Sequence, residues 1–226
     1  MHLLWKFFAF GFSALLPLVN PIGSALVFLG LVGNAPISVY RSLARKIAIN
    51  MMIFLVIIAL VGSSMLSFFG ISLPIMQVSG GIVIAMIGWS LLNEKDSSAK
   101  PEKAQVPLPA LTQFEIDSLQ GKAFYPFTFP ITAGPGCIVV MLTLTAHARQ
   151  AAFSQTVLAY CGLFLALLFL SASIYFCYAY SPKIAHAISP STAHGILRVI
   201  AFILFCIGVQ IAWNGLSDLL PPLLHS

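Results

Sequence analysis

Long apolar stretches alternate with short polar ones along the whole chain. The stretches that lack Asp, Glu, Lys and Arg are residues 7–40, 47–93, 123–148, 150–182 and 199–217. Crossing about 30 Å of hydrocarbon takes roughly 20 apolar residues, so each of these stretches can hold at least one membrane span. The pattern predicts membrane-spanning helices at residues 5–33, 47–69, 75–93, 124–146, 152–180 and 196–216.

The first predicted span has the segment Leu18-Val-Asn20-Pro21-Ile-Gly23 in its middle. A straight helix over residues 5–33 would be about 43 Å long, which exceeds the membrane core. A proline inside a helix removes a backbone hydrogen bond and clashes with the preceding turn, at a cost of about 3 kcal/mol. We therefore expect a break or a re-entrant bend near Asn20. A similar segment, Pro130-Ile-Thr132-Ala-Gly134-Pro135-Gly136, lies in the fourth predicted span.

Residues 94–122 are the only long polar segment, and they separate three predicted spans from three more. We divide the chain into a first three-helix repeat (1–93), a cytoplasmic loop (94–122) and a second three-helix repeat (123–226) within one membrane domain. Because each repeat has an odd number of spans, the second must be inverted relative to the first. The expected fold is an all-α polytopic membrane protein with helices 1 and 4 broken.

Composition excludes a soluble domain, because 8% of the residues are charged and 59% are hydrophobic, whereas soluble domains are about 25% charged. The net charge of +5 forms no continuous basic patch, so nucleic acid is not an expected partner. Most cations fall at the ends of spans that share one side of the membrane. These are Arg41, Arg45, Lys46, Lys95, Lys100, Lys103, Lys122, Lys183 and Arg198, against Lys6 and Arg149 on the other side. The positive-inside rule then places both termini outside the cytoplasm, with the first span retained and not cleaved as a signal peptide.

The two proline-containing segments can supply a binding site made of backbone. Asn is a strong helix N-cap and Pro is favoured at the first helical position, so Asn20-Pro21 indicates a new helix start, and Gly134-Pro135 is similar. Each start should present free N–H groups, at residues 23–25 and 136–138, and the positive end of a helix dipole. Each preceding half-helix should leave free carbonyls, at residues 16–19 and 129–132. The residues predicted to bind substrate are Asn20, Pro21, Gly23, Ser24, Thr132, Gly134, Pro135, Gly136 and Cys137.

Such a centre offers donors to an anion and acceptors to a cation without any charged side chain. A zwitterionic amino acid has both groups on one carbon. No Asp, Glu, Lys or Arg lies within the core of a predicted span, so a substrate with a charged side chain would lack a counter-ion. The residues therefore favour small neutral amino acids. Asn50, Gln210 and Asn214 are further candidates, either to line the pathway or to bond between helices.

Other chemistry finds little support in the sequence. The four cysteines are scattered through apolar runs without metal-ligand spacing, so neither a metal site nor a cofactor is predicted. No nucleophile, base and orienting group fall at useful spacing, and we expect no enzymatic activity. The absence of a Walker motif argues against ATP hydrolysis by this chain.

The chain resembles the MarC family of bacterial inner-membrane proteins, also described as small neutral amino-acid transporters. The resemblance runs nearly end to end. Its motifs are the Asn20 and Gly134 segments, Phe69-Gly-Ile-Ser72, Gly80-Gly-Ile82, Phe124-Tyr-Pro126, and Ile207-Gly-Val-Gln210 with Asn214-Gly215. It implies a six-helix fold of two inverted halves, substrate held at the broken helices, and uptake or exchange of glycine- and alanine-like amino acids. The long central loop and the additional Pro17 depart from the family pattern.

The leading hypothesis is a secondary transporter that works by alternating access in the bacterial inner membrane. Coupling to Na⁺ through freed carbonyls and plain exchange both stay open, and the lack of a carboxylate in the spans disfavours H⁺ coupling through one. The alternative is a non-transporting integral membrane protein with a structural or signalling role. The sequence does not indicate an oligomeric state, a particular amino acid or a direction of transport.

Overall fold

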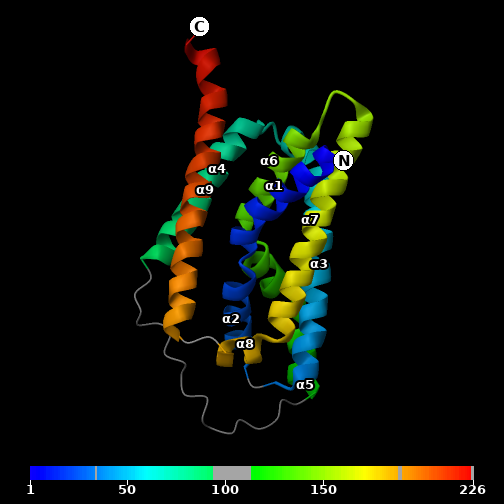
Figure 1. Ribbon diagram of the computed structural model, residues 1–226, viewed down its shortest axis with the longest axis vertical. Coiled ribbons are helices and arrows are strands. Elements are labelled where there is room, and N and C mark those ends of the chain that lie inside the picture. The colour runs from blue at the N-terminus through cyan, green and yellow to red at the C-terminus, as the bar shows by residue number, and fades with distance from the viewer. Residues whose placement is uncertain (34, 94–112, 188–189, 225–226) are drawn as a thin grey trace.

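The computed structural model describes residues 1–33, 35–93, 113–187 and 190–224, and it contains no strand within these ranges. Its long helices run up and down along the long axis of one elongated molecule (Figure 1). In chain order they are α1 (His2–Val19), α2 (Pro21–Val32), α3 (Ile37–Phe68), α4 (Leu73–Leu92), α5 (Gln113–Gly121), η1 (Ala123–Thr132), α6 (Pro135–Ala148), α7 (Phe153–Ala179), α8 (Ser181–Ala187) and α9 (Pro190–Leu224).

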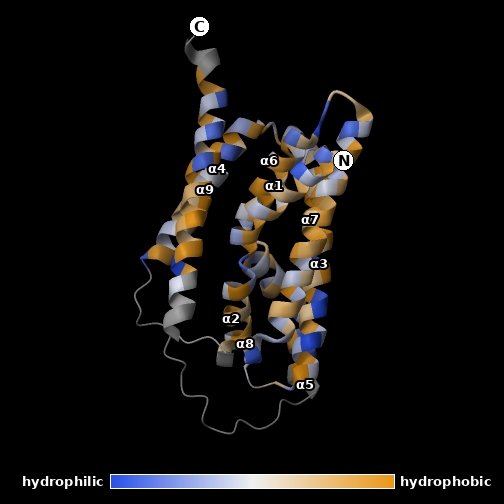
Figure 2. Ribbon diagram, viewed as in Figure 1, coloured by the Kyte–Doolittle hydropathy of each residue, from blue (hydrophilic) through white to orange (hydrophobic). Residues whose placement is uncertain are grey.

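Within the described residues, five segments are long and apolar enough to cross a membrane. They are His2–Val32, Ile37–Phe68, Leu73–Leu92, Phe153–Ala179 and Leu197–Leu220. A sixth candidate is the pair Ala123–Thr132 and Pro135–Ala148, which is bent by 68°. Hydrophobic residues cover the outer faces of the long helices (Figure 2), as lipid requires of a spanning helix. This confirms the prediction of an all-α polytopic membrane protein.

Two polar segments that the sequence analysis placed outside the spans contain helix. Helix α3 starts at Ile37 and not near residue 47, because its basic residues continue the helix instead of forming a loop. Of the predicted loop 94–122, residues 94–112 lie outside the described residues and Gln113–Gly121 form α5. The Lys46 ammonium donates to the Gln120 side-chain oxygen across 2.6 Å and thereby links α3 to α5. The division into two repeats and the inversion of the second stay predictions.

Small residues determine which helices touch. Gly81, Ala85 and Gly88 recur at helical spacing along one face of α4, and the helix that packs on α4 most extensively is α9. A Cβ atom added at Gly88 would lie 2.6 Å from the Phe205 backbone nitrogen, and one at Gly208 would collide with the backbone of Ala85. The backbones of α4 and α9 therefore lie in direct contact. Small residues let membrane helices pack this closely.

Alanine at Gly208 should destabilise the protein because the new methyl group meets backbone that cannot rotate away. Overpacking of this kind costs about 1–3 kcal/mol. Thermal unfolding of the purified protein in detergent would measure the loss. Gly30→Ala is the matched control, since a Cβ there meets nothing within 4 Å. Equal effects of the two substitutions would contradict the backbone contact.

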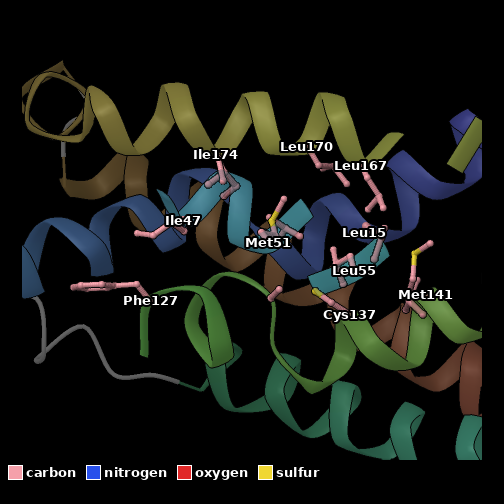
Figure 3. Packing of buried hydrophobic residues seen from close by; sticks show 14 of the residues in the cluster. Leu15, Ile47, Met51, Leu55, Phe127, Cys137, Met141, Leu167, Leu170 and Ile174 are labelled. Carbon is pink, nitrogen blue, oxygen red and sulfur yellow. The ribbon is translucent and has the colours of Figure 1, made fainter. Parts of the chain in front are cut away.

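A second close pair joins α1 to α7. A Cβ atom at Gly162 would meet the Leu4 carbonyl oxygen, and one at Gly11 would lie 3.2 Å from Ala166. On its other side α7 packs against α3, and α3 also packs against η1 and α6. Figure 3 shows how Leu15, Met51, Phe127, Cys137 and Leu170 contribute to one buried cluster from five of these elements. The interrupted segments thus lie inside the protein core, surrounded by the long helices.

Candidate functional site

Asn20 separates two helices in the first apolar segment. Its backbone has φ 42° and ψ 69°, in the left-handed region, which Asn and Asp tolerate better than other residues with side chains. The Asn20 N–H donates to the Leu16 carbonyl and ends α1. The Asn20 side-chain oxygen accepts the Gly23 N–H at 3.1 Å and caps α2, whose first residue is Pro21. Asn20 is therefore the N-cap of a new helix start, as the sequence indicated.

The groups at this start are less available than expected. The predicted free N–H groups at residues 23–25 include that of Gly23, which Asn20 caps, and that of Ser24, which donates to the Asn20 carbonyl. The Ser24 hydroxyl also lies 2.7 Å from the Asn20 carbonyl and 3.1 Å from the Val19 carbonyl. The expectation of free groups was wrong for the N–H groups of Gly23 and Ser24 and for the carbonyls of Leu16 and Val19, because nearby backbone groups and short polar side chains bond to them first. The Asn20 amide nitrogen forms no hydrogen bond within the described residues.

The second interruption is more extended than predicted. Tyr125 and Phe129 inside η1 have φ near −118° and ψ near 126°, because the residue before a proline is pushed out of the helical region. The half-helix expected before Gly134 is therefore present as η1, but its backbone leaves the helical region at these two residues. Thr132 and Thr128 donate their hydroxyls to the carbonyls of Phe127 and Ala123, five residues back.

Helix α6 starts at Pro135 after Ala133 and Gly134. Gly134 is its N-cap and provides no side-chain hydrogen bond, in contrast to Asn20. The Cys137 N–H donates to the Gly134 carbonyl at 3.0 Å. This helix start is thus not closed by a capping side chain, and its dipole favours a negative group.

The two interruptions meet inside the protein. A Cβ atom added at Gly136 would lie 2.6 Å from a Leu18 methyl carbon, so the start of α6 packs against the end of α1. The same Cβ would lie 3.0 Å from Ile84 of α4. A Cβ atom at Gly23 would lie 2.8 Å from Leu197 of α9. Helices α4 and α9 therefore border the junction on its other side.

Tyr178 of α7 connects the two halves of the site. Its hydroxyl lies 2.8 Å from the Thr132 hydroxyl, and the Ser24 hydroxyl lies beside it as well. Because Thr132 already donates to Phe127, Tyr178 is the donor in this pair. The Tyr178 ring stacks on Phe28 of α2 with ring centroids 4.5 Å apart. Both partners are fully buried.

Most of the predicted binding residues are buried at this junction. Pro21, Gly23, Ser24, Thr132, Gly136 and Cys137 are buried, Asn20 and Gly134 are half-buried, and Pro135 is exposed. Tyr178 was missed by the sequence analysis. A tyrosine within an apolar span was the available signal, since a buried phenol usually needs a hydrogen-bond partner.

The candidates for the pathway are placed differently. Gln210 and Asn214 lie on the exposed face of α9, where the Gln210 amide donates to the Asn214 oxygen at 2.8 Å. Asn50 is half-buried on α3. Gln77 of α4 is buried, and its amide nitrogen lies 3.5 Å from the Thr143 hydroxyl of α6. Its oxygen has no partner within the described residues.

Fold and site together define a polytopic helical membrane protein with a small polar centre at two helix interruptions. The chain matches the model of the MarC family integral membrane proteins over residues 5–220, and it belongs to that family. It is 28% identical over 221 residues to the inner membrane proteins MarC of Escherichia coli strain K12 and of Shigella flexneri. The match covers 96% of this chain and 97% of each relative, and it supports a multi-pass inner-membrane protein. No solved structure matches the chain.

Proposed function

We propose that this protein is a secondary transporter of small neutral amino acids similar to glycine and alanine. The observation that carries the proposal is the junction of the two interruptions, where Gly136 packs on Leu18 and the Tyr178 hydroxyl bonds the Thr132 hydroxyl beside Ser24. Discontinuous helices that meet in the membrane supply helix ends to a substrate and its coupling ions in many transporters.

The substrate carboxylate docks at the start of α6 in this proposal. That helix end has no capping side chain, and Asn20, two residues after the Leu18 that packs on Gly136, supplies its amide nitrogen as a second donor. The ammonium group is accepted by hydroxyl oxygens, which keep lone pairs after donating their own protons. The three hydroxyls belong to Ser24, Thr132 and Tyr178.

The surroundings favour a small and uncharged side chain. Gly136 is in close contact with Leu18 and Ile84, so little room is available beside its backbone. The nearest side chains of α4 and α9 are apolar, which leaves a charged substrate side chain without a counter-ion. The buried Gln77 amide lies two turns from Ile84 along α4 and is a better candidate for a pathway residue than the exposed Gln210 and Asn214.

The helix packing is compatible with alternating access. Helix α1 of the first span packs on α7 of the fifth. The corresponding pair is η1 and α6 of the fourth span, which pack on α3 of the second, while α4 of the third span packs on α9 of the sixth. An inverted duplication would give the same pairing, and rocking of one unit against another about a central site would follow from it. The start of α1 and the end of α9 lie at one end of the molecule, opposite α5 and α8 (Figure 1). At that opposite end Arg41 and Lys183 both contact the Tyr180 ring, so we place it in the cytoplasm and both termini in the periplasm.

Flux into proteoliposomes tests the proposal. We expect saturable uptake of labelled glycine and alanine, with lysine and glutamate neither transported nor competing. Separate Na⁺ and H⁺ gradients, and vesicles preloaded with alanine, distinguish ion coupling from exchange. If no condition gives saturable flux, transport is excluded and the non-transporting structural or signalling role takes its place. We also propose that the chain is not an enzyme, so the recovered amino acids should be chemically unchanged.

A further inference from the structure

A groove between α3 and α7 lies outside the junction described above. It has a volume of about 460 Å³. Its lining runs from Arg45 to Ile53 on α3 and, in the opposite direction, from Phe176 to Leu168 on α7. Arg45 therefore lies at the Phe176 end of the groove, and Ile53 lies at the Leu168 end.

The groove opens on the outer surface of two apolar helices. Ile53 is 52% exposed and Phe176 is 58% exposed. Both helices are among the candidate membrane spans. An apolar groove on such a surface faces lipid, so an acyl chain is the occupant that fits its position and its lining.

One end of the groove is positively charged. Arg45 is the charged residue among those that line it. The sequences of α3 and α7 contain no Asp or Glu, and α3 adds Arg41 and Lys46 near the same end. A guanidinium binds phosphate through two parallel hydrogen bonds. Basic sites between membrane helices on the cytoplasmic side recognise anionic lipid headgroups for this reason.

A buried polar group beside the groove also lacks a partner. Ser171 lines the groove, is 7% exposed, and its hydroxyl has no hydrogen-bond partner within the described residues. Ser171 lies five residues before Phe176 and is therefore about 7.5 Å deeper along α7 than the Arg45 end. A phospholipid places its ester carbonyls below its phosphate, and a rotation of the buried Ser171 side chain would bring its hydroxyl to one of them.

We propose that the groove between α3 and α7 binds one anionic phospholipid. The phosphate pairs with Arg45, an ester carbonyl accepts the Ser171 hydroxyl, and an acyl chain follows the apolar lining towards Ile53 and Leu168. The site is independent of the transport proposal, because it involves none of the residues at the two interruptions.

Native mass spectrometry of the full chain in detergent tests this site. We expect the protein to retain dioleoylphosphatidylglycerol in preference to dioleoylphosphatidylcholine. Arg45→Gln should weaken retention of the anionic lipid by about tenfold, since a hydrogen bond to a charged group is lost. Arg149→Gln is the matched control, because Arg149 bonds Ser63 at the other end of α3. Equal retention of the two lipids, or equal losses in the two variants, would overturn the proposal.

A second pair of variants tests the acyl chain. Ala172 lines the groove, so Ala172→Trp should fill it and reduce retention of phosphatidylglycerol. Cys161→Trp adds the same bulk at an exposed position of α7 outside the lining and should leave retention unchanged. Retention that survives Ala172→Trp, or that glycerol 3-phosphate abolishes by competition, would show an anion site without an acyl chain and contradict the groove. Thermal unfolding would verify that each variant is folded.

Discussion

Asn20→Ala is expected to abolish amino-acid uptake and to lower the free energy of unfolding by about 2–3 kcal/mol. The loss of the cap on Gly23 costs about 1 kcal/mol. Alanine in the left-handed conformation of residue 20 costs roughly 1–2 kcal/mol more. The substitution also removes the amide nitrogen that we propose as a donor to the substrate carboxylate. Thermal unfolding in detergent and glycine flux per folded molecule would measure the two effects.

Asn20→Asp separates the two roles of this residue. Aspartate caps helices as well as asparagine does and tolerates the left-handed conformation. We therefore expect the fold to be retained and the loss of stability to stay below that of Asn20→Ala, although an unpaired carboxylate inside a membrane span has a cost of its own. It replaces the amide donor by a negative charge, which repels a carboxylate and should weaken glycine binding by at least about tenfold. Normal uptake by a stable Asn20→Asp variant would contradict the placement of the substrate carboxylate and leave Asn20 a structural role only.

The helix start at Asn20 could be predicted from the sequence because its causes are local. A capping side chain and a proline at the first helical position act within four residues of chain. The close packing of another helix on α4 could also be predicted, because Gly81 and Gly88 repeat at helical spacing. The long apolar runs were likewise sufficient to predict an all-α membrane protein.

The irregular path of η1 is also encoded in the sequence, by two prolines. Pro126 and Pro130 follow each other at nearly one helical turn, and each forces the residue before it into an extended conformation. A regular helix before Gly134 was therefore excluded by a rule that acts locally. The early start of α3 has the opposite cause, since Arg41 and Lys46 are good helix formers even though they are charged.

The composition of the site could not be predicted in full, because its decisive contacts join residues far apart in the chain. The contact between Leu18 and Gly136 and the hydrogen bond between Thr132 and Tyr178 depend on how four separate helical elements pack. The hydrogen bonds of Ser24 with nearby carbonyls depend on one rotamer. Sequence patterns indicated two polar centres, and packing decided that Tyr178 connects them.

Tyr178→Phe should impair transport more than any other change that keeps the side-chain volume in the core. The phenol hydroxyl is buried, and it bonds the Thr132 hydroxyl at 2.8 Å beside Ser24. Its loss leaves buried polar groups without that partner, at about 1–3 kcal/mol of unfolding free energy. The ring stack on Phe28 would persist, so the fold should be retained. The hydrogen bond between η1 and α7 would be lost, and one acceptor for the substrate ammonium would be removed.

The informative measurement is glycine flux together with glycine affinity in the same preparation. Tyr160→Phe is the matched control, since Tyr160 is a half-buried tyrosine on the same helix, five turns before Tyr178. We expect Tyr178→Phe to weaken glycine binding about tenfold, the equivalent of one hydrogen bond to a charged group. Tyr160→Phe should leave binding unchanged. If Tyr178→Phe lowers stability but binds glycine normally, the hydroxyl only joins the helices, and the ammonium must then be held by Ser24, Thr132 and the backbone without it.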